Sequence, residues 1–380
     1  MIYLYKGCDY VKVIVTAGGT GGHIYPALGV IEQLESIGAE ILYIGTKNRM
    51  ESTLIPEKGI NYVGLEIYGL SKTNILRDIK NVGYIIKSYN TCKKIMKEFK
   101  PDYVIGFGGY VTLPVLLAAK NAKIRCGIHE QNKLPGKTNK FLSKYVDETF
   151  TSFEVSDKTF KNKVIVTGNP TGSKALNIKP ADKTKLGFSK DKKLTIIVMG
   201  SLGSQIVNNL LKDFLTNYKN SDNEILFITG KSNYENFKDI SVSKNIKIVP
   251  YYDDLSSIMK VSDLVISRAG ASTISEILSL NKPSILIPSP YVANNHQYYN
   301  ALELKEKGLS YMIEQKDLTT KSLNTAIDYV FTHEKEMITK LKTGENIGIY
   351  TYLYNNYRPI FLIFFSKLAG STALFRVRTL

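Results

Sequence analysis

A glycine-rich turn between an apolar strand and an apolar helix is the first feature of this chain that could bind a ligand. β-Branched residues dominate Val11–Thr16, four glycines lie in Ala17–His23, and an apolar helical pattern begins near Pro26. Glycines permit positive φ and let a ligand approach where a Cβ would block it. Because the N–H groups at a helix N-terminus favour negative charge, the turn predicts a site for an anion or an oxygen-rich ligand.

Two common nucleotide-binding motifs do not fit the glycines of this chain. A dinucleotide motif G-x-G-x-x-G that starts at Gly19 would need a glycine at Ile24, and Gly45–Lys47 lacks the acidic residue expected after the second strand. The sequence Gly230–Ser232 ends like a P-loop, but the leading glycine of that motif would fall on Ile225. The glycine turn is therefore a strand-to-helix site of another kind.

Strands and helices alternate along the chain in two successive series. The first series predicts strands at Val11–Thr16, Glu40–Ile44, Tyr103–Gly106, Ile124–His129, Thr149–Thr151 and Val164–Thr167. The second predicts them at Lys193–Met199, Glu224–Thr229, Ile246–Val249, Leu264–Ser267 and Ser284–Ile287. Such alternation indicates an α/β fold whose parallel sheets bind ligands at the carboxyl ends of their strands.

The polar, glycine-containing stretch between Pro170 and about Lys193 is interpreted as a linker into a second domain. We therefore expect two similar doubly wound domains, at residues 1–170 and 171–343, that face a cleft. Residues 344–380 differ from both, because they show no clean helical period. This last segment is predicted only to be an atypical tail.

Composition limits the classes of protein that the chain can be. At 380 residues, with 43% hydrophobic and 22% charged residues, the chain has the composition of a globular protein of two to three domains. A net charge of +16 suits an anionic partner, although it also fits a lysine-rich source. Cys8, Cys92 and Cys126 have no metal-site or disulfide spacing, and a reducing cytosol fits. No apolar run approaches the roughly 20 residues of a membrane span, so any membrane association is expected to be peripheral.

Several stretches together carry a resemblance to a known enzyme family. They are GGTGGHIYPAL (18–28), GFGGYVTLP (106–114), HEQNKLPGKTNK (129–140), TGNP (167–170), GSLGS (200–204), YYDDL (251–255), SRAGASTISE (267–276) and NHQYYNAL (295–302). In this order they resemble the MurG family of glycosyltransferases. The resemblance implies two Rossmann-like domains of the GT-B class. It also implies transfer of N-acetylglucosamine (GlcNAc) from UDP-GlcNAc to the undecaprenyl-diphosphate-linked muramyl-pentapeptide of peptidoglycan synthesis.

The second domain is expected to hold most of the UDP-GlcNAc. Ala271, Ser272 and Thr273 follow a predicted strand at a helix N-terminus, where N–H groups can face phosphate. The carboxylate of Glu276 could accept hydrogen bonds from two ribose hydroxyls. The alternative is a structural role, in which its negative charge near the helix N-terminus is stabilised by the helix dipole. The resemblance also implies Ser201 at the phosphates, the Tyr252 backbone near uracil and Gln297 on the GlcNAc hydroxyls.

No metal or other cofactor is expected in this reaction. The chain contains no D-x-D sequence, so helix N-termini would stabilise the charge of the leaving group. The adjacent Asp253 and Asp254 are interpreted as a helix cap instead.

The first domain is expected to bind the acceptor and to supply a general base. The resemblance places Thr20, Gly21 and Gly22 near the sugar or diphosphates and Asn132 on GlcNAc hydroxyls. The attacking hydroxyl must lose a proton, and His23 is the simplest candidate because histidine titrates near neutral pH. The alternative is that His23 is structural. His129 and Glu130 are the next candidates for the base, and Lys133 in place of a second histidine excludes an H-E-x-x-H zinc protease site.

A basic and apolar helix is predicted after the first strands. Ile75, Leu76, Ile79, Val82, Ile85, Ile86 and Tyr89 recur at helical spacing among lysines that include Lys80 and Lys87. Such a surface could meet anionic lipid and hold the acceptor's polyprenyl diphosphate. The alternative is a domain helix with an inward apolar face. The predicted location is the cytoplasmic face of the bacterial membrane.

In addition to the atypical tail, the chain departs from the family at one position. The family often has an arginine two residues after the proline of G-N-P, where this chain has Gly172, and Lys174 can replace it only as a point charge.

The competing hypotheses are another GT-B glycolipid glycosyltransferase, a UDP-sugar epimerase, or a basic non-catalytic protein that binds membranes or nucleic acid. No nucleic-acid-binding module is present in the sequence, and the lysines are spread over the whole chain, so nucleic acid is not an expected partner.

Overall fold

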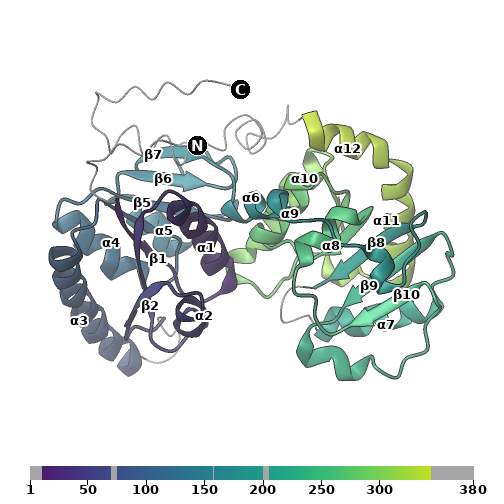
Figure 1. Ribbon diagram of the computed structural model, residues 1–380, viewed down its shortest axis with the longest axis horizontal. Helices are drawn as coiled ribbons and strands as arrows, with labels where there is room; N and C mark the ends of the chain where they lie inside the picture. Colours follow the sequence, from purple (N-terminus) through teal and green to yellow (C-terminus); the bar gives the residue numbers. More distant parts are fainter. Residues whose placement is uncertain (1–10, 70–74, 157, 200–204, 344–380) are drawn as a thin grey trace. The chain divides into compact units, whose positions relative to one another are not determined.

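The computed structural model describes residues 11–69, 75–156, 158–199 and 205–343. These residues form two compact units, each built on one parallel sheet (Figure 1). The first unit contains residues 11–131 and 135–170, and the second contains 132–134 and 171–343. Ser201 and the tail 344–380 lie outside the described residues.

The first unit has a seven-stranded sheet in the order β3-β2-β1-β4-β5-β6-β7, and every pair of neighbours is parallel. The strands are β1 (Lys12–Thr16), β2 (Glu40–Thr46), β3 (Asn61–Leu65), β4 (Tyr103–Gly106), β5 (Cys126–Glu130), β6 (Glu148–Thr151) and β7 (Lys163–Val166). The helices are α1 (Gly21–Ser36), α2 (Glu51–Glu57), α3 (Ile75–Phe99), α4 (Thr112–Asn121) and α5 (Lys137–Leu142). The strand order reverses between β2 and β4, which makes the end of β1 the topological switch point.

Helices cover both faces of this sheet because side chains alternate along its strands. Val13 and Val15 point to one face and join a core cluster with residues of α1 such as Ile24 and Ile31. Ile14 points to the other face and joins residues of α3 and α4. Figure 1 shows α1 on one side of the sheet and α3 and α4 on the other.

The second unit has a six-stranded parallel sheet in the order β10-β9-β8-β11-β12-β13. The strands are β8 (Lys193–Val198), β9 (Asn223–Ile228), β10 (Ile246–Val249), β11 (Leu264–Ser267), β12 (Ser284–Leu286) and β13 (Tyr311–Met312). The α-helices are α6 (Pro170–Asn177), α7 (Gln205–Asn217), α8 (Leu255–Val261), α9 (Ala271–Ser279), α10 (His296–Glu306), α11 (Thr320–Thr332) and α12 (Glu334–Thr343). Short 3₁₀ helices are η1 (Lys183–Leu186), η2 (Lys231–Asn236), η3 (Ala293–Asn295) and η4 (Gln315–Asp317).

Aspartates fix the amino ends of both sheets. Asp102 accepts a hydrogen bond from the N–H of Lys12, and Asp263 accepts one from the N–H of Leu194, each at 2.8 Å. The N–H of Lys12 opens β1, at the end of that strand opposite the glycine turn, and the N–H of Leu194 belongs to the second residue of β8. The two edges of each sheet therefore differ in role, with structural carboxylates at the amino ends and candidate ligand groups at the carboxyl ends.

The sequence predicts the strands within about two residues but misses two of them. β3, with the sequence NYVGL, contains asparagine and glycine, which are poor strand formers, and pairing with β2 imposes its extended conformation. β13 has only two residues, too few for any alternation to show. Both lie at an edge of their sheet, where one neighbour strand suffices.

Candidate active site

Two glycine loops meet at the switch point of the first sheet. The N–H of Gly18, just after β1, donates to the carbonyl of Gly108, just after β4, at 3.2 Å. A Cβ built on Gly109 would lie only 2.4 Å from the Gly18 oxygen, so the two backbones touch. No side chain fits between them, and the contact orients the carbonyl of Gly18.

His23, in the first turn of α1, lies against these loops. Its Nδ1 is 3.1 Å from the Gly18 oxygen. Because a carbonyl can only accept, Nδ1 is the donor in this contact, and in the neutral ring Nε2 then carries the lone pair. Gly108 lies along the other edge of the ring, since a Cβ there would be 3.0 Å from Nε2. The imidazole is thus held in the tautomer that a general base at Nε2 requires.

Thr20, Gly21 and Gly22 form the N-terminus of α1. Thr20 is the N-cap residue in extended conformation, and its side chain makes no capping hydrogen bond. Thr20 and Gly22 are exposed, and Gly21 is partly buried. A ligand at this helix N-terminus can therefore meet a hydroxyl and backbone N–H groups together.

His129 and Glu130 are packed into the first unit. His129 is 1% exposed, its Nε2 donates to the Gly168 oxygen at 2.9 Å, and Nδ1 accepts from Gln131 at 3.2 Å. Burial lowers the pKa of His129 to about 4, although the bond to Gly168 opposes that shift. Glu130 accepts from the N–H of Gly136 and from Asn139, at 2.9 and 3.0 Å. These contacts point to structural roles for both residues and disfavour either as the general base.

Asn132 belongs to the second unit with Lys133 and Leu134. Oδ1 of Asn132 accepts from Nδ2 of Asn300 in α10 at 3.2 Å. The N–H of Lys133 donates to Oδ1 of Asn300 at 2.9 Å. Lys133 also pairs with Glu303 at 2.7 Å. Asn132 is therefore held by α10 rather than by β5, which precedes it in the chain.

The start of α9 is the candidate anion-binding feature of the second unit, and it follows β11 directly. Ala271, Ser272 and Thr273 supply the first-turn N–H groups, which have no acceptor within the helix. The Ser272 hydroxyl is buried and has no hydrogen-bond partner among the described residues. A buried hydroxyl without a partner is costly, so a ligand oxygen at this helix N-terminus would stabilise it.

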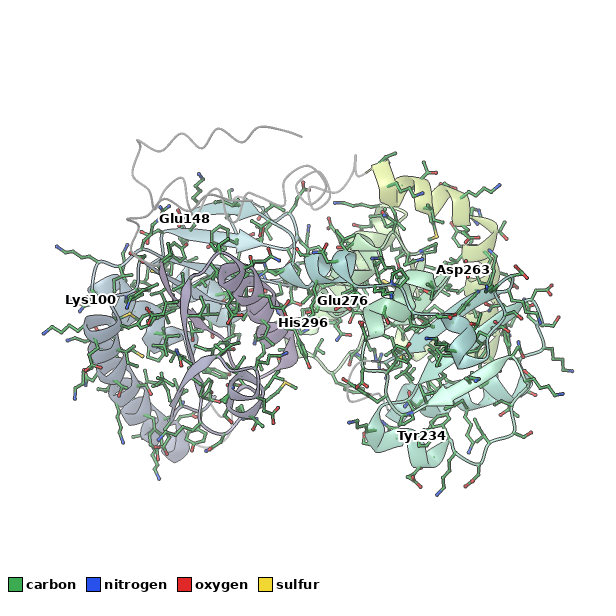
Figure 2. All side chains as sticks on the ribbon, in the orientation of Figure 1. Lys100, Glu148, Tyr234, Asp263, Glu276 and His296 are labelled. Atoms are coloured by element: carbon green, nitrogen blue, oxygen red, sulfur yellow. The ribbon has the colours of Figure 1, made fainter. Side chains whose placement is uncertain are left out.

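Glu276 lies one turn further along α9 (Figure 2). Burial raises the pKa of its carboxyl to about 7, while the charge of Lys174 opposes the shift and that of Asp254 adds to it. A carboxylate in this position can accept two hydroxyl hydrogen bonds. Asp254 itself caps α8, because its side chain accepts from the N–H of Ser257. The interpretation of Asp254 as a helix cap is confirmed.

Gln297 is presented by a strained turn. Asn294 and Asn295, just before α10, both have left-handed backbones, with φ of 54° and 51°. Oε1 of Gln297 accepts from the N–H of Ser289 at 2.9 Å, which leaves its amide N–H groups as donors.

Tyr252 is partly buried between β10 and α8.

Arg268 was not predicted from the sequence. It follows β11 directly and is 7% exposed. Its guanidinium donates to the Ile287 oxygen at 3.0 Å and to Gln315 at 2.6 Å, and burial lowers its pKa to about 10. The residue thereby ties the loop after β12 to the start of α9. The sequence signal that could have singled out Arg268 is its position between β11 and Gly270, because an arginine there is close in sequence to the candidate phosphate site.

Gly172 allows α6 to pack closely on α9. A Cβ at this position would lie 2.3 Å from Oγ of Ser279 and 2.5 Å from Oγ of Ser275. A larger side chain such as arginine would not fit this packing without movement.

The helix α3 exposes an apolar stripe beside lysines. Ile79, Val82 and Ile86 are 64%, 51% and 57% exposed, and Lys80 and Lys87 are exposed. Ile85 and Tyr89 pack partly into the core instead. The side chains of Ile75 and Leu76 lie outside the described residues. Among the helices of the described ranges, none is long and apolar enough to span a membrane.

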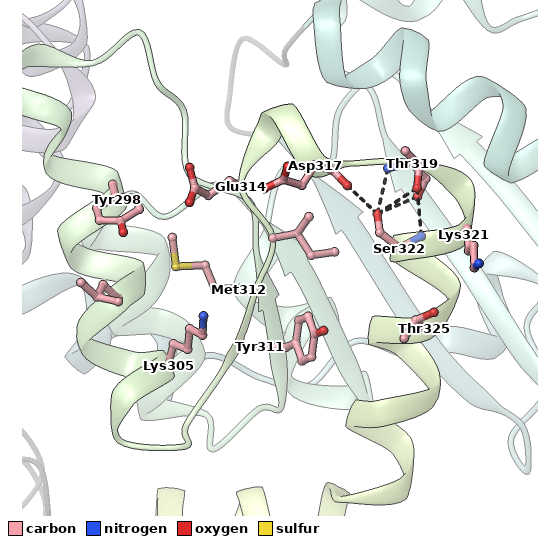
Figure 3. A pocket seen from close by; sticks show the side chains of 12 residues that line it. Tyr298, Lys305, Tyr311, Met312, Glu314, Asp317, Thr319, Lys321, Ser322 and Thr325 are labelled. Carbon is pink, nitrogen blue, oxygen red and sulfur yellow. Dashed lines mark hydrogen bonds between the residues drawn. The ribbon is translucent and has the colours of Figure 1, made fainter.

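A pocket of about 440 Å³ lies elsewhere in the second unit (Figure 3). It is lined by side chains of α10, β13 and the start of α11, such as Tyr298, Tyr311 and Ser322. Two lysines and two acids face it, so it lacks the positive balance of a diphosphate site. None of the predicted site residues lines it.

Comparisons with known proteins agree with this geometry. Residues 13–151 match the glycosyltransferase family 28 N-terminal domain, and residues 194–347 match the glycosyltransferase family 28 C-terminal domain. The UDP-N-acetylglucosamine–N-acetylmuramyl-(pentapeptide) pyrophosphoryl-undecaprenol N-acetylglucosamine transferase of Bacillus cytotoxicus is 39% identical over 89% of this chain and 95% of its own length. The protein of the same name from Clostridioides difficile is also 39% identical, over 89% of this chain and 85% of its own length.

Solved structures show the same architecture. The crystal structure of Acinetobacter baumannii MurG superposes with a TM-score of 0.70 at 28% identity and covers 88% of this chain and 95% of that one. A putative UDP-N-acetylglucosamine 2-epimerase from Listeria monocytogenes has a TM-score of 0.60 at 16% identity, over 88% of this chain and 91% of that one, and it shows the fold alone. By the family matches and the 39% identical relatives, the chain belongs to glycosyltransferase family 28, within the MurG group of N-acetylglucosaminyltransferases.

Proposed function

We propose that this protein transfers GlcNAc from UDP-GlcNAc to the undecaprenyl-diphosphate-linked muramyl-pentapeptide. The observation that carries the proposal is the contact of His23 Nδ1 with the Gly18 oxygen, which directs Nε2 away from that carbonyl at the switch point of the first sheet. The relatives' names supply the substrates, since those proteins are 39% identical to this chain over nearly their whole length.

The second unit supplies the donor site in this proposal. First-turn N–H groups of Ala271, Ser272 and Thr273 bind the diphosphate, and the Ser272 hydroxyl gains the partner that it lacks. Glu276 accepts from the ribose hydroxyls as a carboxylate. Gln297 donates to GlcNAc hydroxyls through the amide group that Ser289 leaves unused. By resemblance, Ser201 contributes at the phosphates, the backbone of Tyr252 near uracil and Asn132 at the sugar.

The first unit supplies the base. Nε2 of His23 takes the proton of the acceptor hydroxyl while that oxygen forms a bond to the anomeric carbon of GlcNAc. The bond from the anomeric carbon to the UDP oxygen breaks in the same displacement, and UDP leaves with the electron pair. The N–H groups at the start of α9 stabilise the charge that develops on the leaving phosphate. Thr20, Gly21 and Gly22 position the acceptor's oxygens beside His23.

His23 is favoured as the base over His129 and Glu130 because it is more exposed and because fewer of its side-chain atoms are occupied by hydrogen bonds. His129 has both ring nitrogens engaged by protein groups, and its pKa of about 4 gives it little affinity for a proton at neutral pH. Oε2 of Glu130 accepts from two donors at the start of α5, the N–H of Gly136 and the side chain of Asn139. His23 keeps one nitrogen for the substrate.

The proposal includes docking of the first unit on the cytoplasmic face of the membrane, where the polyprenyl chain of the acceptor resides. Ile79, Val82 and Ile86 recur at helical spacing on one face of α3 and are more than half exposed. Exposed apolar side chains beside Lys80 and Lys87 suit the interface of an anionic bilayer. Association of this kind needs no membrane-spanning segment.

The test is transfer of labelled GlcNAc from UDP-GlcNAc to the lipid-linked muramyl-pentapeptide in the presence of a chelator, with the product identified by mass. We expect a disaccharide-linked lipid and no dependence on added metal. Binding of UDP-GlcNAc without product would reject the acceptor, and failure of both would reject the donor as well.

A further inference from the structure

Glu51 is a fully buried carboxylate that the reaction scheme above does not use. It is the first residue of α2, in the first unit, and its exposure is 0%. A buried carboxylate is expensive unless donors surround it, and it is almost never kept only for packing. Its partners therefore indicate what it does.

Three donors converge on the Glu51 carboxylate. Oε1 accepts from the hydroxyl of Thr46 at 2.7 Å and from the N–H of the same residue at 3.1 Å. Oε2 accepts from the N–H of Gly19 at 3.3 Å. Thr46 ends β2, whereas Gly19 lies in the glycine turn after β1, so the carboxylate joins the turn to the neighbouring strand.

The peptide between Gly18 and Gly19 connects Glu51 to His23. Its N–H donates to Glu51, and its carbonyl accepts from Nδ1 of His23 at 3.1 Å. In a trans peptide these two groups point in opposite directions, and the described residues contain no cis peptide. One rigid plane thus has a carboxylate on one side and the candidate base on the other.

Glycine on both sides makes this peptide easy to rotate. Gly19 has φ of +95°, and neither residue has a Cβ to resist a flip of the plane between them. A flipped plane would turn the carbonyl oxygen toward the Glu51 carboxylate and the N–H toward His23. The negative carboxylate disfavours that arrangement, and in the observed one it polarises the carbonyl that holds Nδ1–H.

The surroundings of Glu51 are built to hold it in place. A Cβ on Gly18 would lie 2.7 Å from Oε1, so that glycine makes room for the carboxylate. The hydroxyl of Tyr62 donates to the Thr46 oxygen, and that of Tyr43 donates to the Ala17 oxygen at 3.1 Å. Burial, together with the charge of Glu51, raises the pKa of both tyrosines, so both remain protonated donors.

We propose that Glu51 is a positioning residue for His23, which fixes the Gly18–Gly19 peptide so that the imidazole keeps its proton on Nδ1 and presents Nε2 to the acceptor hydroxyl. The proposal rests on the proposed function, because it assigns His23 the role of base. It resembles the carboxylate–imidazole pairing of hydrolases in its logic, but here a backbone peptide stands between the two groups.

The informative variant is Glu51→Gln, which keeps the volume and removes the charge. Its amide can donate to a flipped carbonyl, so both orientations of the peptide become accessible. We expect kcat to fall about 10- to 100-fold, by analogy with the loss of a partner that orients a metal-ligating histidine. KM for UDP-GlcNAc should stay within about twofold, since the proposed donor groups are in the second unit. Long-range ¹H–¹⁵N correlation spectra should show the His23 ring change from one tautomer to a mixture.

Glu148→Gln is the matched control. Glu148 is also a buried carboxylate of the first unit, and it pairs with Arg125 and Tyr103 (Figure 2). It lies at the amino end of β6, whereas the glycine turn follows the carboxyl end of β1. It should lower the unfolding temperature and leave kcat and the His23 tautomer unchanged. If Glu51→Gln does not fold, Glu51→Asp takes its place, because it keeps the charge but withdraws it from Gly19.

A double variant separates positioning from an independent effect. In a His23→Asn background the substitution of Glu51 should cost little further activity, because the residue through which it acts is gone. Unchanged kcat in Glu51→Gln, an unchanged tautomer, or losses that multiply in the double variant would each overturn the role of Glu51. Absence of transfer by the wild-type chain would instead reject the proposed function.

Discussion

Two histidines show how the environment of a residue decides its chemistry. His23 lies in the first turn of α1 after β1, whereas His129 lies near the end of β5, and both belong to motifs that carry the family resemblance. His129 is enclosed and bonded at both nitrogens, whereas His23 is partly exposed and, among the described residues, is bonded at Nδ1 alone. Sequence reasoning put His23 first on motif position, and the hydrogen bonds supply a physical reason for that order, which stays a prediction.

Glu276 gives a pH dependence that can be measured at the donor site. Its carboxylate must be ionised to accept from two ribose hydroxyls, and burial raises its pKa to about 7. The ionised fraction falls as pH falls through 7, so affinity for UDP-GlcNAc should drop about tenfold from pH 8 to pH 6. Titration calorimetry at a series of pH values measures this.

The control for that prediction is Glu276→Gln, which cannot ionise. It should bind UDP-GlcNAc more weakly than the wild type at pH 8 and with little dependence on pH. A wild-type affinity that is flat between pH 6 and pH 8 would remove Glu276 from the ribose site.

At the scale of elements, Gly172 is the residue that permits the close packing of α6 on α9. Gly172→Ala should destabilise the protein by about 1–2 kcal/mol, because overpacking outweighs the gain in helix propensity. Urea unfolding followed by circular dichroism measures the change. Ser173→Ala, one residue on, is the control and should be within about 0.5 kcal/mol of the wild type.

A rescue experiment identifies the clash. Gly172→Ala combined with Ser279→Ala should recover part of the lost stability, because the hydroxyl that lies nearest to the added methyl group is removed. Equal stability of wild type and Gly172→Ala would show that α6 and α9 can separate freely.

The stripe on α3 predicts a surface function that is separable from catalysis. Replacing Ile79, Val82 and Ile86 by serine should weaken binding to vesicles of anionic phospholipid at least tenfold, since each buried side chain contributes about 1 kcal/mol or more. Stability and affinity for UDP-GlcNAc should not change, because these side chains are exposed. Cosedimentation with vesicles is the measurement.

Leu210→Ser provides a control of the same chemistry on α7 of the second unit, where Leu210 is 41% exposed. It should leave vesicle binding unchanged. Equal binding by the triple serine variant and the wild type would exclude α3 as the docking surface.

At the scale of the whole molecule, much of the architecture could be predicted from the sequence. Apolar strands such as KVIVT and KLTIIV stand out because both faces of a parallel sheet are covered. β3 and β13 could not be predicted, since their extended conformation comes from pairing with a neighbour rather than from their own residues. The glycine turn and the start of α9 could be placed because loops after switch-point strands carry ligands in this fold class.

Residues that act through the backbone were beyond prediction. Glu51 lies 32 positions after Gly19, and nothing in the spacing reveals that its carboxylate meets the glycine turn. Arg268 stood in a quoted motif, yet its contacts with Ile287 and Gln315 depend on how β12 and η4 fold back. Such tertiary contacts become visible only in coordinates.

The most direct test of the account compares the wild type with His23→Asn in the transfer of GlcNAc from UDP-GlcNAc to the lipid-linked muramyl-pentapeptide. Asparagine can still donate to the Gly18 carbonyl, but it has no group that accepts a proton in place of Nε2. We predict transfer by the wild type, a kcat reduced about 10²- to 10⁴-fold in the variant, and equal affinity of both for UDP-GlcNAc. Equal kcat in the two proteins would contradict the assignment of His23 as the base, and no transfer by the wild type would contradict the proposed function itself.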